Sequence, residues 1–213
     1  MLLCMRSLNW ITLGMLCLTA AAQPTEAPVS LGIVFDTSGS MGAKLARSRQ
    51  MTAQFLKTAD AQDQFFLIEA NDRPVLTTPF TTDTYRLQDH LVFIQSKGRS
   101  ALWDSVYLGL SEMKRGQNPR KALLVISDGG DNSSRYTEDQ VAKMAREARI
   151  PIYAFGVNDS AGGRTTEELE GPGRLKEIAE QSGGRYFAVE RLDDIPSFAA
   201  QVTGEVRSAA PIR

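Results

Sequence analysis

The chain has 213 residues, of which 42% are hydrophobic and 23% charged, an ordinary globular composition with enough length to bury a sizeable core. Its formal net charge of −1 argues against bulk electrostatic binding to nucleic acid or to an anionic membrane. Two cysteines exclude a disulfide scaffold and a thiolate zinc cluster. A single histidine speaks against a histidine-rich metal site and against a Ser-His-Asp triad.

The first segment, residues 1–22, has the pattern of a secretory signal. Arg6 is its only charge, and an apolar run from Leu8 ends in three small residues at Ala20-Ala21-Ala22. This run of roughly 15 residues is shorter than the ~20 that a membrane-spanning helix needs, so a membrane anchor is the less favoured alternative. We therefore expect cleavage after residue 22 and a secreted or periplasmic protein, whose mature part lacks both cysteines.

Strand-like and helix-like segments alternate through the remaining chain. Continuous or alternating apolar residues predict strands over residues 31–36, 64–69, 74–78, 121–128, 152–157 and 185–189. Helical spacing predicts helices over residues 41–58, 84–93, 101–114, 138–149, 174–181 and 195–206, with a long loop over 159–173. This alternation is typical of one doubly wound α/β domain, over residues 27–207. We expect a mostly parallel sheet with an antiparallel edge strand at 74–78, flanked by helices.

Oxygen-bearing side chains follow the first strand, in the run Asp36-Thr37-Ser38-Gly39-Ser40. Asp36 ends the strand, and the hydroxyls of Ser38 and Ser40 lie at alternate positions of the loop after it. Carboxylates and hydroxyls are the ligands of hard cations such as Mg²⁺. Ser, Thr and Asp are also favoured at helix N-caps, so the run alone is equally compatible with simple capping.

A second carboxylate occupies the matching place after another strand. Asp128 ends the apolar run of residues 121–128 and is followed by Gly129-Gly130. In open parallel sheets, ligands gather beyond the carboxyl ends of the strands where the strand order reverses, so Asp36 and Asp128 could face one crevice. Asp before Gly is also a common turn former, and Asp128 alone does not decide between the two roles.

Three motifs together resemble one known family. The run Ile33 to Met41 resembles the metal-ion-dependent adhesion site, D-x-S-x-S, of von Willebrand factor type A domains. Residues 98–104 (GRSALWD) are similar to the second loop of that site, and residues 124–129 (LVISDG) are similar to the third. The motifs occur in the family's order across nearly the whole mature chain. The resemblance implies a Rossmann-like fold of the short bacterial type A kind.

The resemblance also implies roles for individual residues. Ser38 and Ser40 would bind the metal directly, whereas Asp36 and Asp128 would hold it largely through water. Ser100 stands where the family usually has threonine, so the hydroxyl is kept but the methyl that restricts its rotamer is lost. Asp104 and Asp131 are interpreted as capping or supporting residues.

Such a site implies binding rather than catalysis. We expect one divalent cation, Mg²⁺ with Mn²⁺ or Ca²⁺ as alternatives, that recruits an Asp or Glu carboxylate of a protein partner in an adhesion or assembly scaffold. No nucleic-acid partner is expected, and a membrane only through an uncleaved signal or a membrane-bound partner. The alternatives are a metal-dependent hydrolase or phosphoryl-transfer enzyme, and a metal-free anion pocket.

Other conspicuous side chains are expected to be structural. His90 lies on a predicted helix and is interpreted as a surface residue. Trp103 and Tyr107 have helical spacing and are expected to pack against neighbouring elements, and Phe65 and Phe66 to belong to the core. None of these residues is assigned a role in binding.

Overall fold

Alternating strands and helices build one sheet in the part of the chain that the computed structural model describes, residues 27–157 and 166–212. The strands are β1 (Val29–Asp36), β2 (Gln64–Ala70), β3 (Val75–Thr81), β4 (Arg120–Ser127), β5 (Ile152–Gly156) and β6 (Tyr186–Ala188). They lie in the order β3-β2-β1-β4-β5-β6. All neighbours are parallel except β2 and β3, so the predicted fold class and its antiparallel edge strand are confirmed.

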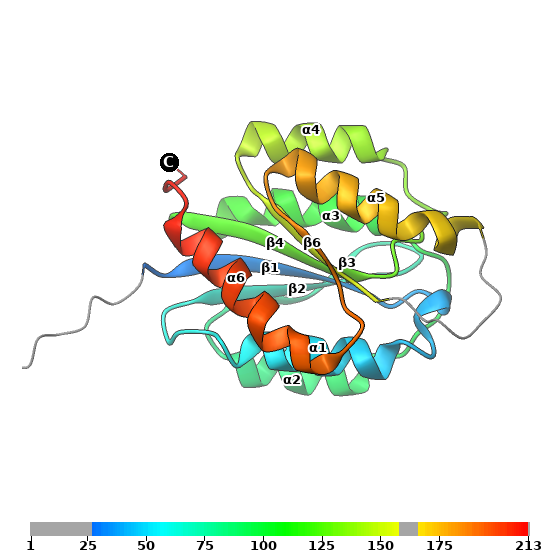
Figure 1. Cartoon of the computed structure of the whole chain (residues 1–213), viewed down its shortest axis with the longest axis horizontal. Helices are drawn as coiled ribbons and strands as arrows, with labels where there is room; N and C mark the ends of the chain where they lie inside the picture. The colour runs from blue at the N-terminus through cyan, green and yellow to red at the C-terminus, as the bar shows by residue number, and fades with distance from the viewer. Residues whose placement is uncertain (1–26, 158–165, 213) are drawn as a thin grey trace, which may run out of the picture.

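Helices cover both faces of this sheet (Figure 1). One layer consists of α1 (Leu45–Leu56), α2 (Thr84–Phe93) and α6 (Ile195–Ser208), and the other of α3 (Leu102–Glu112), α4 (Glu138–Ala148) and α5 (Thr166–Ser182). Short 3₁₀ turns occur at Gly39–Met41, Met113–Arg115 and Leu192–Asp194. Because each layer buries one face of the sheet, a strand such as β1 is apolar on both sides.

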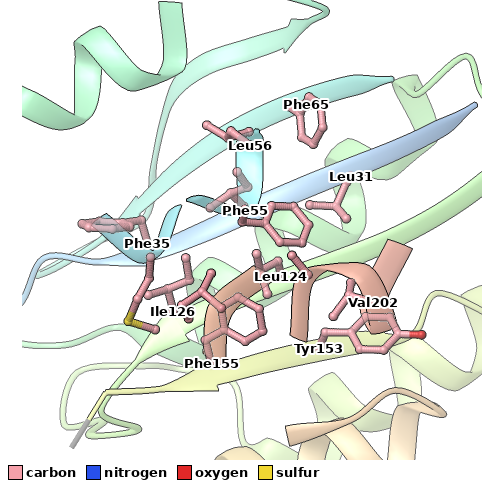
Figure 2. Packing of buried hydrophobic residues seen from close by; sticks show 14 of the residues in the cluster. Leu31, Phe35, Phe55, Leu56, Phe65, Leu124, Ile126, Tyr153, Phe155 and Val202 are labelled. Atoms are coloured by element: carbon pink, nitrogen blue, oxygen red, sulfur yellow. The ribbon is translucent and has the colours of Figure 1, made fainter. Parts of the chain in front are cut away.

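The hydrophobic core is divided in two by the sheet. Phe35 of β1 belongs to the cluster that also contains Phe55 of α1 and Phe155 of β5 (Figure 2), and the rings of Phe55 and Phe155 meet edge to face with 6.1 Å between their centroids. Val34, the neighbour of Phe35 in the chain, points to the other face and joins the cluster of Leu110. Two packed layers hold β1 rigidly, and the residue that ends it is therefore fixed in position.

The strand order reverses between β1 and β4. From β1 the chain continues outward through β2 and β3, whereas β4 leads to β5 and β6 on the other side. The two central strands pair in parallel with Phe35 opposite Ile126, so Asp36 and Ser127 end them at the same edge. This is the topological switch point at which open α/β sheets bind ligands.

The main difference from the predicted elements concerns α5. The sequence predicts a loop over 159–173 and a helix over 174–181, but the helix already begins at Thr166 and contains Pro172. Glycine and proline in this stretch disfavour a helix. Tertiary contacts outweigh that preference here, since Gly171 packs tightly on the backbone of Gly129. The prediction of a loop is therefore wrong from Thr166 onward.

Smaller differences lie at the ends of elements. The predicted helix over 41–58 begins only at Leu45, because Gly39–Met41 form a separate 3₁₀ turn. No helix in the described part of the chain combines the length and the apolar character needed to cross a bilayer. The predicted signal over 1–22 lies outside the described residues, and the domain limits of 27–207 stay a prediction.

Candidate metal centre at the carboxyl ends of β1 and β4

Asp36, the last residue of β1, is a fully buried carboxylate. Its Oδ1 accepts a hydrogen bond from the Ser38 backbone N–H at 2.9 Å, and its Oδ2 accepts one from Ser127 Oγ at 2.5 Å. Burial, and next the negative charge of Asp128, raise the pKa of Asp36 to about 7, against the opposing effect of these hydrogen bonds. Among the described residues Asp36 has no cationic partner, so its charge is only partly compensated.

The hydroxyls of Ser38 and Ser40 lie together beside Asp36. Their Oγ atoms are 3.1 Å apart, as the alternate positions in the loop predict. Ser38 is buried, whereas Ser40 is exposed on the rim. The Ser38 side chain makes no capping hydrogen bond, and α1 begins only at Leu45 with Lys44 in the N-cap position. The capping interpretation of these serines is therefore not supported by the geometry.

Asp128 follows β4 and is also buried. Its Oδ1 accepts the Gly130 N–H at 3.0 Å, which is the turn-forming contact that an Asp before Gly suggests. Its Oδ2 lies 2.7 Å from the Nζ of Lys44, whose side chain is only 11% exposed. Asp128 therefore has the turn-forming role that the sequence left open, and its negative charge also acts on Asp36.

Ser100 lies in the loop between α2 and α3 and is buried with an unsatisfied hydroxyl. Its backbone is well bonded, since its N–H donates to Asn132 Oδ1 and its carbonyl accepts the N–H groups of Asn132 and Ser133. Its Oγ, in contrast, has no hydrogen-bond partner among the described residues. Leaving a buried polar atom unpaired costs about 1–3 kcal/mol, which points to a ligand that the hydroxyl would satisfy.

Backbone hydrogen bonds tie the three loops into one unit. The second loop donates from Lys97 N–H to the Thr37 carbonyl at 2.9 Å and accepts the Gly39 N–H at the Gly98 carbonyl at 3.0 Å. On its other side it is bonded to the Asp128 loop through Ser100 and Asn132. The five predicted ligands, Asp36, Ser38, Ser40, Ser100 and Asp128, are thus carried by loops in direct contact.

Asp104 and Asp131 cap backbone groups around the centre. Asp131 Oδ1 accepts the Leu102 N–H at the start of α3 at 2.8 Å, and burial raises the pKa of Asp131. Asp104 Oδ1 accepts the N–H groups of Arg135 and Tyr136 at 2.8 and 3.0 Å. These contacts are of the capping kind expected from the sequence, and they fix α3 and the segment before α4 beside the loops.

The other conspicuous side chains are structural, as predicted. His90 Nε2 lies 2.8 Å from Glu69 Oε1, and its side chain is 37% exposed. Trp103 is buried, and the ring of Tyr107 stacks on Tyr136 with 3.8 Å between centroids. Phe65 and Phe66 are buried on opposite faces of β2. None of these contacts involves the predicted ligands.

The donor set fits a hard divalent cation. It offers two carboxylates and three hydroxyls, all oxygen, and includes the unsatisfied Ser100 Oγ. In the described residues, no group of three or more His, Cys, Asp or Glu side chains is arranged to hold a metal. Sequence reasoning missed Ser127 and Lys44, because no local pattern reveals contacts made across 91 and 84 positions of the chain.

Fold and site together define a doubly wound α/β domain with a candidate adhesion-type metal centre. Residues 31–201 match the von Willebrand factor type A domain, and the chain belongs to that family. An uncharacterized protein of Borreliella burgdorferi is 26% identical over 187 residues, covering 77% of this chain and 54% of the relative. The chain therefore spans about half the length of this curated relative.

Solved structures share the fold at low identity. An aerotolerance-related membrane protein from Bacteroides fragilis superposes with a TM-score of 0.69 and 18% identity, covering 85% of this chain and 100% of the other. Three N-terminal domains of the type V pili tip protein Mfa5 from Porphyromonas gingivalis give 0.64 and 14%, with 82% of this chain and 48% of the other covered. At such identities the likeness shows the fold alone.

Proposed function

We propose that this domain is a metal-dependent protein-binding module, in which Mg²⁺ held at the candidate centre recruits an acidic side chain of a partner. Asp36, Ser38, Ser40, Ser100 and Asp128 would hold the ion. The observation that carries the proposal comes from the described residues: the buried Asp36 carboxylate has no cationic partner among them, faces the negative charge of Asp128, and lies near the Ser100 hydroxyl, which has no hydrogen-bond partner among them either. Mn²⁺ and Ca²⁺ are the alternative ions.

The charge balance explains why an external cation would be stabilising. The two buried carboxylates repel each other, and among the described residues Asp128 has a cationic partner, Lys44, whereas Asp36 has neutral donors only. A bound Mg²⁺ would supply a compact double positive charge and an open position for one more oxygen ligand. The exposed side of the centre, where Ser40 lies, is the direction from which a partner would approach.

The chemistry of the surrounding residues favours binding over catalysis. Hydrolysis or phosphoryl transfer needs a positioned base or nucleophile in addition to the ion. His90, the only histidine of the chain, is bonded to Glu69 on β2. Asp104 and Asp131 are occupied by backbone N–H groups. We therefore assign the domain to partner recognition in an adhesion or assembly scaffold.

The comparisons support this class of function and an extracytoplasmic place. A pilus tip protein and a membrane protein share the fold. The secretory pattern over 1–22 agrees with a secreted or periplasmic location. We propose that the partner is a protein offering an Asp or Glu carboxylate, and that contact with a membrane arises only through the partner or an uncleaved signal.

Calorimetry on the domain from residue 23 onward tests the metal first. Mg²⁺ should bind with a stoichiometry of one, and binding should be lost in Asp36→Asn. The matched control is Asp193→Asn, which changes the same charge at a side chain that is 83% exposed and should leave the affinity unchanged. Absence of a binding isotherm for Mg²⁺, Mn²⁺ and Ca²⁺ in a folded protein would refute the metal site.

Affinity capture tests the partner. Immobilised domain should retain a partner from the extracytoplasmic fraction of its own source in Mg²⁺ and release it in chelator. Asp36→Asn should not retain it, whereas Asp193→Asn should. A partner retained equally under all of these conditions would show that recognition does not depend on the metal.

A further inference from the structure

We propose that Lys44 is a tethered cation that neutralises Asp128 in the metal-free domain and competes with the incoming metal ion for that carboxylate. The proposal rests on the proposed function, because it concerns the same centre. It adds an ion pair that would set the metal affinity and stabilise the centre in the absence of metal. It arises from one ion pair that no sequence motif predicted.

The contact is short and largely removed from solvent. Lys44 Nζ lies 2.7 Å from Asp128 Oδ2, and the two side chains are 11% and 2% exposed. At this burial an ion pair is weakly screened by salt and by water. Asp128 Oδ2 therefore has a full positive charge in contact with it before any metal arrives.

The position of Lys44 in the fold is unfavourable for a cation in two respects. Lys44 occupies the N-cap position of α1, where the helix dipole repels cations. Burying an ammonium group also costs desolvation energy. Asp128 offsets both effects, so the pairing holds the loop before α1 and the loop after β4 against each other across 84 positions of the chain.

The same arrangement obstructs a metal ion. A divalent cation that used Asp128 would stand beside a second positive charge unless the ammonium moved away. Lysine has a flexible four-carbon stem, so Nζ can leave Asp128 without a change in the backbone. Metal binding then includes the cost of breaking the ion pair, and the observed affinity is lower than the ligand set alone would give.

Within the centre, Asp36 differs from Asp128 in the charge of its partners. It has only neutral donors among the described residues, whereas Asp128 has Lys44. As far as the described residues go, the metal-free centre is thus half neutralised: Asp128 has a cationic partner, and Asp36 is compensated only in part by hydrogen bonds. This division predicts that removal of Lys44 acts oppositely on the metal-free and the metal-bound protein.

Calorimetry with Mg²⁺ alone, without a partner, tests the competition. Lys44→Met keeps most of the side-chain length and removes the charge, and we expect it to bind Mg²⁺ about tenfold more tightly or better, since a charged hydrogen bond contributes about 1.5–3 kcal/mol. Lys57→Met, at the exposed far end of α1, is the matched control with the same change of net charge and should stay within about twofold of wild type. Lys44→Arg keeps the charge and should bind no more tightly than wild type.

Thermal unfolding provides a second, independent measurement. In chelator, Lys44→Met should melt several degrees below wild type, and saturating Mg²⁺ should raise its Tm by more than it raises that of wild type. If wild type binds Mg²⁺ and Lys44→Met binds equally or less tightly, the competition is refuted while the metal site stands. If Lys44→Met does not fold, an unaltered Mg²⁺ affinity in Lys44→Gln refutes the competition in the same way. If neither protein binds any divalent ion, the proposed function itself fails.

Discussion

Two buried aspartates lie at opposite ends of β1, and the fold treats them differently. Asp63, before β2, accepts the Val29 N–H at 2.9 Å and the Asp60 N–H at 2.8 Å, and pairs with Arg207 of α6 at 2.7 Å. Asp36, at the other end, has hydrogen bonds from Ser38 and Ser127 and faces the negative charge of Asp128. Arg207 neutralises the first carboxylate, whereas the second has neutral donors alone among the residues that the structure describes.

The two carboxylates differ in their partners and not in their burial. Both side chains are essentially inaccessible to water, at 1% and 0% exposure. Arg207, the cationic partner of Asp63, lies on α6, far from Asp63 in the sequence. The ion pair therefore fixes this helix against the start of the sheet. A comparable cationic side chain paired with Asp36 would occupy the site that we propose for the metal.

The largest effect is expected at Asp63. Asp63→Asn replaces a buried carboxylate of the Arg207 ion pair by an amide while Asp60 stays beside Arg207, and the loss of this charge-assisted contact should lower the free energy of unfolding by about 2 kcal/mol. Urea unfolding measures it, and the loss should be the same in Mg²⁺ and in chelator. The control Asp193→Asn, in an exposed ion pair, should cost less than about 1 kcal/mol. A loss at Asp63 no larger than the control's would remove the structural half of the comparison.

Asp36→Asn should abolish metal binding and leave metal-free stability nearly unchanged. The amide cannot carry the buried charge that repels Asp128, so metal-free stability should stay within about 1 kcal/mol of wild type or rise. The increase in Tm that Mg²⁺ gives the wild-type protein should be lost. Differential scanning calorimetry in chelator and in Mg²⁺ measures both. A metal-free destabilisation as large as that of Asp63→Asn would show that Asp36 is structural too.

A smaller effect on stability is expected at two buried serines, Ser30 and Ser100, which differ in their hydrogen-bond partners. Ser30 Oγ, at the base of β1, donates to Gln64 Oε1 at 3.3 Å and accepts the Asn118 N–H at 3.1 Å, so Ser30→Ala should cost about 1 kcal/mol. Ser100 Oγ has no partner among the described residues, so Ser100→Ala should leave metal-free stability unchanged and weaken Mg²⁺ binding instead. Chemical unfolding and calorimetry on the two variants measure these effects. Equal stability losses at the two positions would contradict the unsatisfied state of Ser100.

Much of the fold follows from local sequence patterns. Continuous apolar runs identify β1 and β4 because helices cover both faces of the sheet, and the reversal of strand order brings their ends together. From the sequence alone, Asp36 and Asp128 could face one crevice, and the strand order of the structure brings the two strand ends together. The beginning of α5 was not predictable in this way, because Gly171 and Pro172 break helices in general and are accommodated here by contact with another loop.

The proximity of some predicted ligands follows from the sequence, but the charge pairing around them does not. The spacing of Ser38 and Ser40 correctly places their hydroxyls together, 3.1 Å apart. The Lys44–Asp128 pair depends on which way a long side chain turns from the start of α1, and no local periodicity determines that direction. The hydrogen bond from Ser127 to Asp36 depends likewise on the exact alignment of β1 with β4.

The close approach of Gly129 to Gly171 has a mechanical consequence. A Cβ atom on Gly129 would lie 2.2 Å from the Gly171 carbonyl oxygen, and one on Gly171 would lie 2.2 Å from the Asp128 carbonyl oxygen. The backbone of the Asp128 turn therefore packs directly on the backbone of α5, with no side chain between them. The turn cannot shift toward that helix unless the helix also moves, so a displacement in that direction would be passed on to α5.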